Sequence, residues 1–110
     1  MEPIVLATCL LNLGIALLHR FERYGGEGDI EEAILRQSAA VDIFQHLAAV
    51  GDIPAHHSSL FQSVSNVGAA FVRRFVRYSL QKDIDEAIQL QDNAVKLARQ
   101  HRYLSWRDNT

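Results

Sequence analysis

The fold of this chain is decided by a stretch that occurs twice. Residues 12–24 read NLGIALLHRFERY, and residues 66–78 read NVGAAFVRRFVRY. With an offset of 54 positions, the alignment extends without a gap over residues 12–42 and 66–96, and fifteen of its thirty-one positions are identical. A repeat of this length indicates a chain built from two similar supersecondary units.

Each unit is predicted to form a pair of antiparallel helices. In the first helix of each unit, large apolar residues recur every three or four positions, which is the period of a helix that buries one face. The expected apolar stripes are Leu6, Leu10, Leu13, Leu17, Phe21 and Tyr24 in unit one, and Leu60, Val64, Val67, Phe71, Phe75 and Tyr78 in unit two.

The helix ends are predicted from capping signals. Gly25-Gly26 follows the first helix, as expected where a C-terminal cap adopts the left-handed conformation. Ser79 stands at this position in unit two, and there we expect the helix to run further. The second helices are expected to open with capping boxes, in which a carboxylate satisfies free backbone amides. These boxes pair Asp29 with Glu32 and Asp83 with Glu86.

These signals predict an all-α fold of two antiparallel helical hairpins, four helices in all. The first helix is expected to end near Tyr24, and the others to span about 29–49, 57–80 and 83–103, with a turn at 51–57. Residues 1–110 are taken as a single domain: repeat 1 about 3–56, repeat 2 about 57–103 and a tail at 104–110.

Composition excludes several classes of protein. The 110 residues suit one small domain, and the net charge of -2 does not favour a nucleic-acid partner. A single cysteine cannot form an internal disulfide, which suits a cytoplasmic location. The apolar run 4–18 is short for a membrane span, and its repeat counterpart is the internal segment 58–72, so we expect neither a membrane partner nor a signal peptide.

The strings NLG at 12–14, DIEEAI at 29–34 and AV at 40–41 resemble tetratricopeptide (TPR) repeats, and 66–68, 83–88 and 94–95 repeat them. In an ordinary TPR the glycine lies twelve residues before the first alanine of the second helix, whereas here the separation is nineteen. The seven extra residues add about two helical turns and keep the apolar stripe nearly in phase. The variant is similar to the long repeats of large fungal arrays, some of which are linked to CHAT or nucleotide-binding domains.

The resemblance implies a short TPR-like α-solenoid that acts as a non-catalytic scaffold. Such arrays bind a protein or peptide partner in the groove of their first helices. The groove positions are then Thr8, Asn12, Ile15 and His19 in repeat 1, and Gln62, Asn66, Ala69 and Arg73 in repeat 2. A clamp for a peptide carboxylate is not expected, because Thr8 and Gln62 stand where that TPR subclass has lysine.

A basic strip at the end of the groove is the second candidate binding feature. It would comprise Arg20, Arg23, Arg73, Arg74 and Arg77, and would suit acidic or phosphorylated partners. The partner-binding residues predicted from both features are Asn12, His19, Asn66, Arg73 and Arg77. Two structural alternatives stay open: the asparagines bridge adjacent helices, and Arg20 and Arg74 pair with repeated acids such as Glu32 and Glu86.

The remaining chemistry-bearing residues are expected to be structural. Phe21, Phe75, Tyr24 and Tyr78 are predicted to pack in the core, Cys9 to be a buried thiol, and His56 and His57 to lie in a solvated turn. We expect no enzyme activity, metal or cofactor, since no catalytic or ligand spacing is present.

An alternative to the binding module rests on the fourth helix, which still carries apolar residues near its end. In that reading the chain self-associates through this uncapped helix, or is a fragment of a longer array, with a structural or regulatory role.

Overall fold

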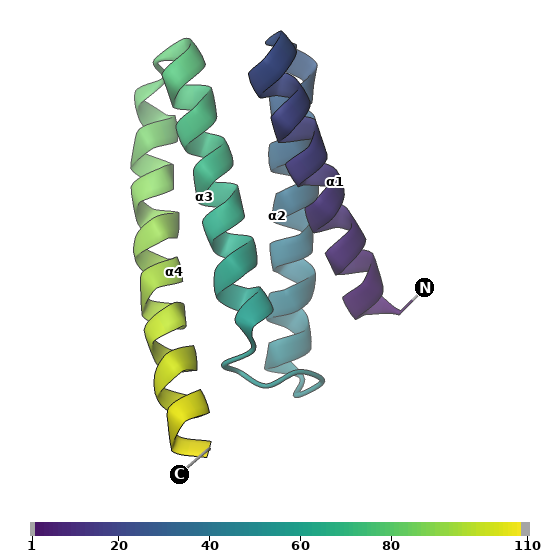
Figure 1. The fold of residues 1–110 in the computed structure, drawn as a ribbon, viewed down its shortest axis with the longest axis vertical. Helices are drawn as coiled ribbons and strands as arrows, with labels where there is room; N and C mark the ends of the chain where they lie inside the picture. The colour runs from purple at the N-terminus through teal and green to yellow at the C-terminus, as the bar shows by residue number, and fades with distance from the viewer. Residues whose placement is uncertain (1, 109–110) are drawn as a thin grey trace.

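The computed structural model of the protein describes residues 2–108 and contains four helices in that range. They are α1 (Pro3–Tyr24), α2 (Glu27–Ala49), α3 (Ser58–Tyr78) and α4 (Gln81–Asp108). Helix α1 packs on α2 and α3 packs on α4, and the two antiparallel hairpins meet through α2 and α3 (Figure 1). The all-α fold with two hairpins is therefore confirmed.

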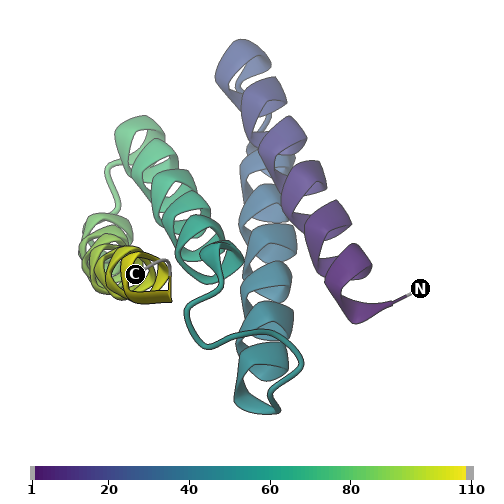
Figure 2. The same cartoon turned by 60° about the horizontal axis from the view of Figure 1, so that its bottom comes forward.

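The hairpins lie side by side, so that α4, α3, α2 and α1 follow one another across the molecule (Figure 1). The chain passes from the first hairpin to the second through residues 50–57, which loop out at the end of α2 (Figure 2). Gly51 adopts a φ of 82° in this loop, and Ile53 is buried. The predicted turn at 51–57 is thus confirmed.

The predicted capping boxes are wrong. The amides of Asp29 and Asp83 donate to the carbonyls of Gly26 and Leu80, so both aspartates lie inside the first turn of their helices. The N-cap of α2 is Gly26, and no side chain caps it. Each aspartate carboxylate, which was expected to accept from backbone amides, instead binds an arginine through two charge-assisted hydrogen bonds.

The two first helices end in the same way. Gly25 adopts the left-handed conformation with φ 73°, and its amide donates to the carbonyl of Phe21 at 2.6 Å. Ser79 repeats this cap with φ 58° and a 2.7 Å bond to Phe75, although it is not glycine. The expectation that α3 runs past this point is therefore wrong, whereas α4 continues beyond its expected end to Asp108.

Small residues let the paired helices approach closely. Ala33, Ala40, Ala87 and Ala94 are all buried. A Cβ atom added at Gly14 would collide with the Cγ of Gln37, and one added at Gly68 would lie 2.8 Å from the Nε2 of Gln91. Both repeated glycines therefore lie at helix–helix contacts, where no larger residue fits without displacement.

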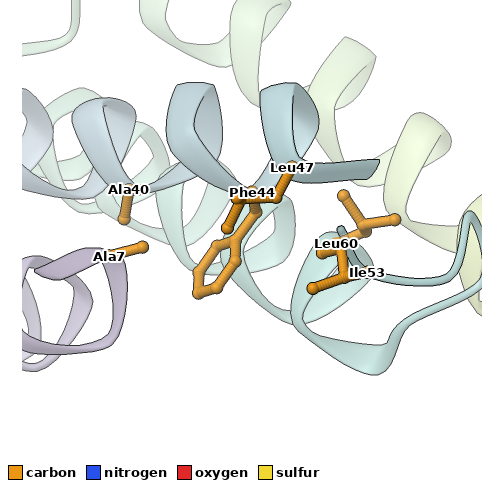
Figure 3. Close-up of a cluster of buried hydrophobic side chains, with 6 residues drawn as sticks. All are labelled: Ala7, Ala40, Phe44, Leu47, Ile53 and Leu60. Carbon is orange, nitrogen blue, oxygen red and sulfur yellow. The ribbon is translucent and has the colours of Figure 1, made fainter. Parts of the chain in front are cut away.

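One hydrophobic cluster ties the two hairpins and their linker together. Phe44 and Leu47 of α2 pack with Ile53 of the linker and Leu60 of α3 (Figure 3). Ala7 of α1 and Ala40 of α2 complete the cluster. The linker thus contributes to the core, which holds the second hairpin against the first.

The predicted apolar stripe is correct for α3 and partly wrong for α1. Every stripe residue of α3 is buried or half-buried, but Leu6, Leu13 and Tyr24 of α1 are 40%, 46% and 74% exposed. Cys9, expected to be buried, is also exposed, whereas its counterpart Ser63 is fully buried. The difference arises because α3 packs between α2 and α4, while α1 packs mainly on α2.

Helix α1 consequently turns much of its apolar surface outward. The apolar run 4–18 was expected to be too short for a membrane span, but the whole of α1 is long and apolar enough to cross a membrane by length and composition, with a mean hydropathy of 1.8 over an 18-residue window. Only 22% of that window is buried in the fold. Core helices of soluble proteins and signal sequences near an N-terminus pass the same test. Core helices are mostly buried, whereas much of the apolar surface of α1 is not covered in this fold.

His56 and His57 are half-buried, not solvated as predicted. The Nδ1 atom of His57 accepts a hydrogen bond from the amide of Ser59 at 3.1 Å and so caps α3. The carbonyl of His56 lies 2.6 Å from Nδ1 of His101 on α4. The pair therefore anchors the linker to the second hairpin.

Candidate functional site

A groove that joins the two hairpins lies between the C-terminal ends of α1 and α3. It encloses about 340 Å³. Its walls are apolar at Phe21 and Val76 and charged at Glu22, Arg73 and Arg77. We call it the α1–α3 groove, and its lining residues are Phe21, Glu22, Gly25, Arg73, Val76 and Arg77.

One ion pair spans this groove. The Nε atom of Arg73 donates to Oε1 of Glu22 at 2.8 Å, and the two side chains are 47% and 43% exposed. An ion pair with this exposure contributes little stability, because water screens both charges. A carboxylate or phosphate from outside could therefore replace Glu22 on Arg73 at small cost.

The second arginine of the groove has no acidic partner among residues 2–108. The guanidinium carbon of Arg77 lies 5.8 Å from the ring centroid of Tyr78, its sequence neighbour. A cation over an aromatic face keeps its charge and its hydrogen-bond donors available for a ligand. The groove thus offers one unpaired guanidinium beside one that is loosely paired.

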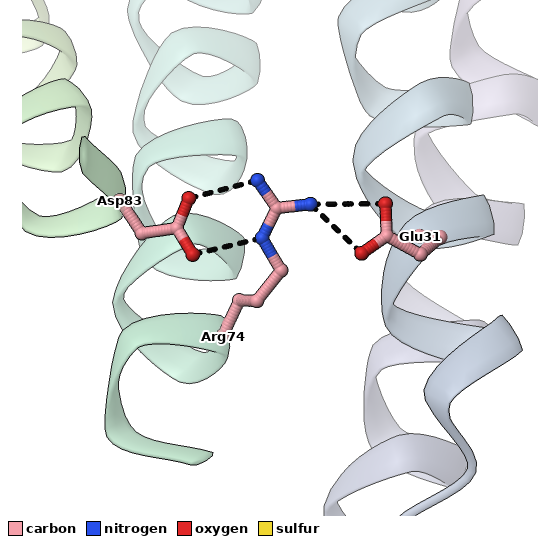
Figure 4. Close-up of polar contacts among 3 residues, drawn as sticks. All are labelled: Glu31, Arg74 and Asp83. Carbon is pink, nitrogen blue, oxygen red and sulfur yellow. Dashed lines mark hydrogen bonds and ion pairs between the residues drawn. The ribbon is translucent and has the colours of Figure 1, made fainter. Parts of the chain in front are cut away.

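The predicted basic strip is divided by the fold. Arg74 binds Asp83 through Nε and Nη2 at 2.9 and 2.8 Å, and its Nη1 reaches both carboxylate oxygens of Glu31 at 2.9 Å (Figure 4). These hydrogen bonds, first of all those to Asp83, raise the pKa of Arg74 above its ordinary value. Its ion pairs thus join α3 to α4 and α2. Because the Arg74 side chain is only 13% exposed, it is not available to a partner.

Arg20 repeats part of this arrangement in the first hairpin. Its Nε and Nη2 atoms donate to Asp29 at 2.8 and 2.7 Å. The alternative that Arg20 and Arg74 pair with repeated acids is thus correct in kind. The acids are Asp29 and Asp83, however, since Glu32 binds Arg36 one turn further along α2.

The five predicted partner-binding residues are only partly brought together. Arg73 and Arg77 line the α1–α3 groove. Asn66 lies on α3 two turns before Arg73, in a separate shallow hollow of about 280 Å³ with Phe61, Gln62 and Ser65. Asn12 and His19 are exposed on α1 and line neither hollow.

The asparagines do not bridge helices. Within residues 2–108, neither the Asn12 amide nor the Asn66 amide forms a hydrogen bond. Asn66 is half-buried beside its hollow, so its amide donors and acceptor remain available for the backbone of a ligand.

Sequence reasoning missed Glu22 and Val76, which occupy equivalent positions in the two repeats. Glu22 meets a residue 51 positions away, and nothing local signals that contact. The repeat alignment gives one signal for this site, because the acid Glu22 in repeat 1 aligns with the apolar Val76 in repeat 2.

No cluster of three or more histidine, cysteine, aspartate or glutamate side chains suited to a metal ion is found in the described part of the chain. The α1–α3 groove presents the guanidinium groups of Arg73 and Arg77 beside the apolar surface of Phe21 and Val76. Comparison of the chain with known protein families, with curated proteins and with solved structures finds no match.

Proposed function

We propose that this protein is a non-catalytic interaction module, a short TPR-like solenoid that binds an acidic segment of another protein in the α1–α3 groove. The observation that carries the proposal is Arg77, a cation without an acidic partner among the described residues, next to the exposed Arg73–Glu22 pair. A carboxylate or phosphate group would find up to two guanidinium donors there.

The apolar walls add a second requirement on the ligand. Phe21 is buried at the base of the groove and Val76 is 72% exposed at its rim. A large side chain close to the acidic group would cover Val76 and exclude water from the arginines. The favoured ligand is therefore an extended or helical segment with an acid next to an aromatic or aliphatic residue.

The TPR-like character of the proposal rests on the repeated contacts within each hairpin. In both repeats a glycine of the first helix packs against a glutamine of the second, Gly14 on Gln37 and Gly68 on Gln91. Buried alanines at seven-residue spacing follow in both second helices. Two hairpins with the same internal contacts, joined through α2 and α3, support a solenoid of two units.

The test is selection of peptides from a random 12-residue display library on the immobilised protein. We expect enrichment of peptides with an acid beside a large apolar residue. Arg77→Glu should weaken a selected peptide at least about tenfold, because a favourable contact to charge becomes repulsive. Added salt should weaken binding of the peptide to the wild-type protein, because it screens the charges of both.

The chain supplies a matched control for this experiment. Arg23 is the repeat counterpart of Arg77 and lies over Tyr24 at 5.6 Å, but it does not line the groove. Arg23→Glu should leave peptide affinity within about twofold. Selection of no peptide, or equal loss in both variants, would refute a binding site in the α1–α3 groove.

A further inference from the structure

The surface by which the two hairpins meet is present again, uncovered, at both ends of the molecule. Between the hairpins, Val41 of α2 packs with Val64 and Val67 of α3, and Glu31 of α2 binds Arg74 of α3. Subtracting 54 from a residue number in α3 gives the equivalent residue of α1, and adding 54 to a residue number in α2 gives the equivalent residue of α4. The equivalents of this internal interface can therefore be compared residue by residue.

The first uncovered surface, here called the head face, lies on α1 and comprises Leu6, Leu13, Arg20 and Tyr24. Leu60 and Val67 of α3 are 6% and 4% exposed, but their counterparts Leu6 and Leu13 are 40% and 46% exposed. Tyr24, the counterpart of the half-buried Tyr78, is 74% exposed. The head face therefore keeps the residue types of an interface without the partner that α3 has.

The second uncovered surface, here called the tail face, lies on α4 and comprises Asp85, Ile88 and Val95. Val41 is 9% exposed, whereas its identical counterpart Val95 is 47% exposed. Ile34 is half-buried on α2, and its identical counterpart Ile88 is 62% exposed. The tail face thus repeats the apolar surface of α2 that receives α3.

The charges of the two faces are also complementary. Arg20 is held by Asp29 as Arg74 is held by Asp83, which leaves its Nη1 atom without a hydrogen bond among the described residues. In Arg74 the same atom reaches Glu31 of the neighbouring hairpin. The counterpart of Glu31 is Asp85, an exposed acid on the tail face whose described contact is the amide of Gln81 at 3.1 Å.

A second pair of charges supports the same match. The internal hollow between the hairpins is lined by two acids, Asp42 of α2 and Glu86 of α4. If the tail face of one copy met the head face of a second copy, the residue equivalent to Asp42 would be Lys96 of the first copy. The residue equivalent to Glu86 would be Glu32 of the second copy, so the two would carry opposite charges. The end faces are thus better matched in charge at this point than the interface inside the chain.

We propose that copies of this protein stack head to tail, with the tail face of one copy on the head face of the next in the geometry of the α2–α3 contact. Arg20 of one copy donates through Nη1 to Asp85 of its neighbour. Leu13 and Tyr24 cover Ile88 and Val95 in the same contact. Because the two faces differ, each addition leaves one head and one tail open, and the stack grows with concentration.

This proposal is independent of the peptide site, because none of the groove residues belongs to either face. The first measurement is sedimentation velocity of the whole chain from about 1 µM to about 300 µM, a range that covers ordinary transient contacts. The mean mass should rise beyond that of a dimer. A monomer throughout the range would overturn the proposal.

Two variants that block opposite ends make the geometry testable. Leu13→Lys places an ammonium group in the head face and Val95→Lys places one in the tail face, so each variant alone should remain monomeric. Mixed in equal amounts, they should form one heterodimer of 1:1 composition and nothing larger, because only one intact head and one intact tail remain. A homodimer formed by either variant alone would overturn the head-to-tail arrangement.

Control variants separate the faces from general surface apolarity. Leu35 is 58% exposed on α2 and belongs to neither face, so Leu35→Lys should assemble as the wild type does. Asp85→Asn should weaken assembly about tenfold, and Glu27→Gln, an exposed acid outside both faces, should not. Circular dichroism should show unchanged helix content in all variants.

The apolarity of α1 would also suit a lipid bilayer, and the same samples test binding to one. Phosphatidylcholine vesicles are added to the wild type and to Leu13→Lys and cosedimented. Assembly in solution with no vesicle binding is the expected result. Vesicle binding by a protein that is monomeric in solution would assign the face to lipid and overturn the proposal.

Discussion

Arg74 places both Nε and Nη2 on the carboxylate of Asp83, at 2.9 and 2.8 Å, and the Asp83 side chain is only 1% exposed. Arg20 and Asp29 make the same two-bond contact in the first hairpin, but the Arg20 side chain is 61% exposed and that of Asp29 17%. One motif therefore occurs twice, once inside the fold and once near its surface.

Arg74→Ala should consequently destabilise the protein far more than Arg20→Ala. Removal of Arg74 leaves a buried carboxylate without its cation, which costs about 3–5 kcal/mol of unfolding free energy. Removal of Arg20 exposes Asp29 to water, which solvates it, so the loss should be small. Urea unfolding followed by circular dichroism measures both, and equal losses would contradict the role assigned to burial.

The two repeated glutamines should respond with opposite signs to substitution by methionine. Gln37 is fully buried, and its amide has no hydrogen-bond partner among the described residues. The amide of Gln91 donates to the carbonyl of Ser65 at 3.0 Å and accepts from its hydroxyl at 3.2 Å. Leu11 stands at the Ser65 position in repeat 1 and offers no hydroxyl.

Methionine has a similar length and no amide to satisfy. We therefore expect Gln37→Met to raise the free energy of unfolding by about 1 kcal/mol and Gln91→Met to lower it by about the same amount. Thermal melts of both variants against the wild type decide this. Destabilisation by both substitutions would show that the Gln37 amide is satisfied in solution.

Glycine positions provide a third comparison. Gly68→Ala should destabilise the protein by about 1–3 kcal/mol, because its Cβ would press on Gln91 in the contact between α3 and α4. Gly28 lies in the first turn of α2 with nothing within 4 Å of an added Cβ. Gly28→Ala should stabilise by about 0.5–1 kcal/mol, since alanine favours the helix. Denaturant unfolding measures both effects. The midpoint should fall in Gly68→Ala and rise in Gly28→Ala, while the dependence of the unfolding free energy on denaturant concentration stays unchanged.

The pH dependence of the first hairpin follows from Asp29. Its hydrogen bonds to Arg20 hold the pKa of the Asp29 carboxyl below its ordinary value of about 4. A lowered pKa in the folded state means that this contact stabilises the fold above about pH 4 and is lost as the pH falls through the folded value. Carbon-detected NMR titration should show the Asp29 pKa rising toward its ordinary value in Arg20→Gln. An unchanged pKa in that variant would rule out Arg20 as the cause.

Much of the fold could be predicted because its signals are local. The apolar period of three and four specifies helices, and the repeat shows that the two halves share one hairpin design. Gly25 signalled its cap correctly, since a left-handed residue favours glycine. The same rule failed at Ser79, which adopts the left-handed cap with φ 58° although it is not glycine.

The candidate site could be predicted only in part, for a different reason. Arg73 and Arg77 were found because the basic strip is visible in sequence, but the pairing of Arg73 with Glu22 depends on how α1 lies against α3. The capping boxes failed similarly. Each aspartate was predicted to cap its helix, and Arg20 and Arg74 were expected to pair with repeated acids. The acids named for that pairing were Glu32 and Glu86, whereas the arginines bind Asp29 and Asp83.

By itself the sequence determined four helices, two hairpins and the residues that let each hairpin close, because propensity, period and small residues act over a few turns. Only the tertiary structure decided which faces are covered. Leu60 and Leu6 are the same residue at the same place in each repeat, yet they are 6% and 40% exposed. Burial is a property of the neighbour as much as of the residue, and α3 has a helix on either side where α1 has an open face.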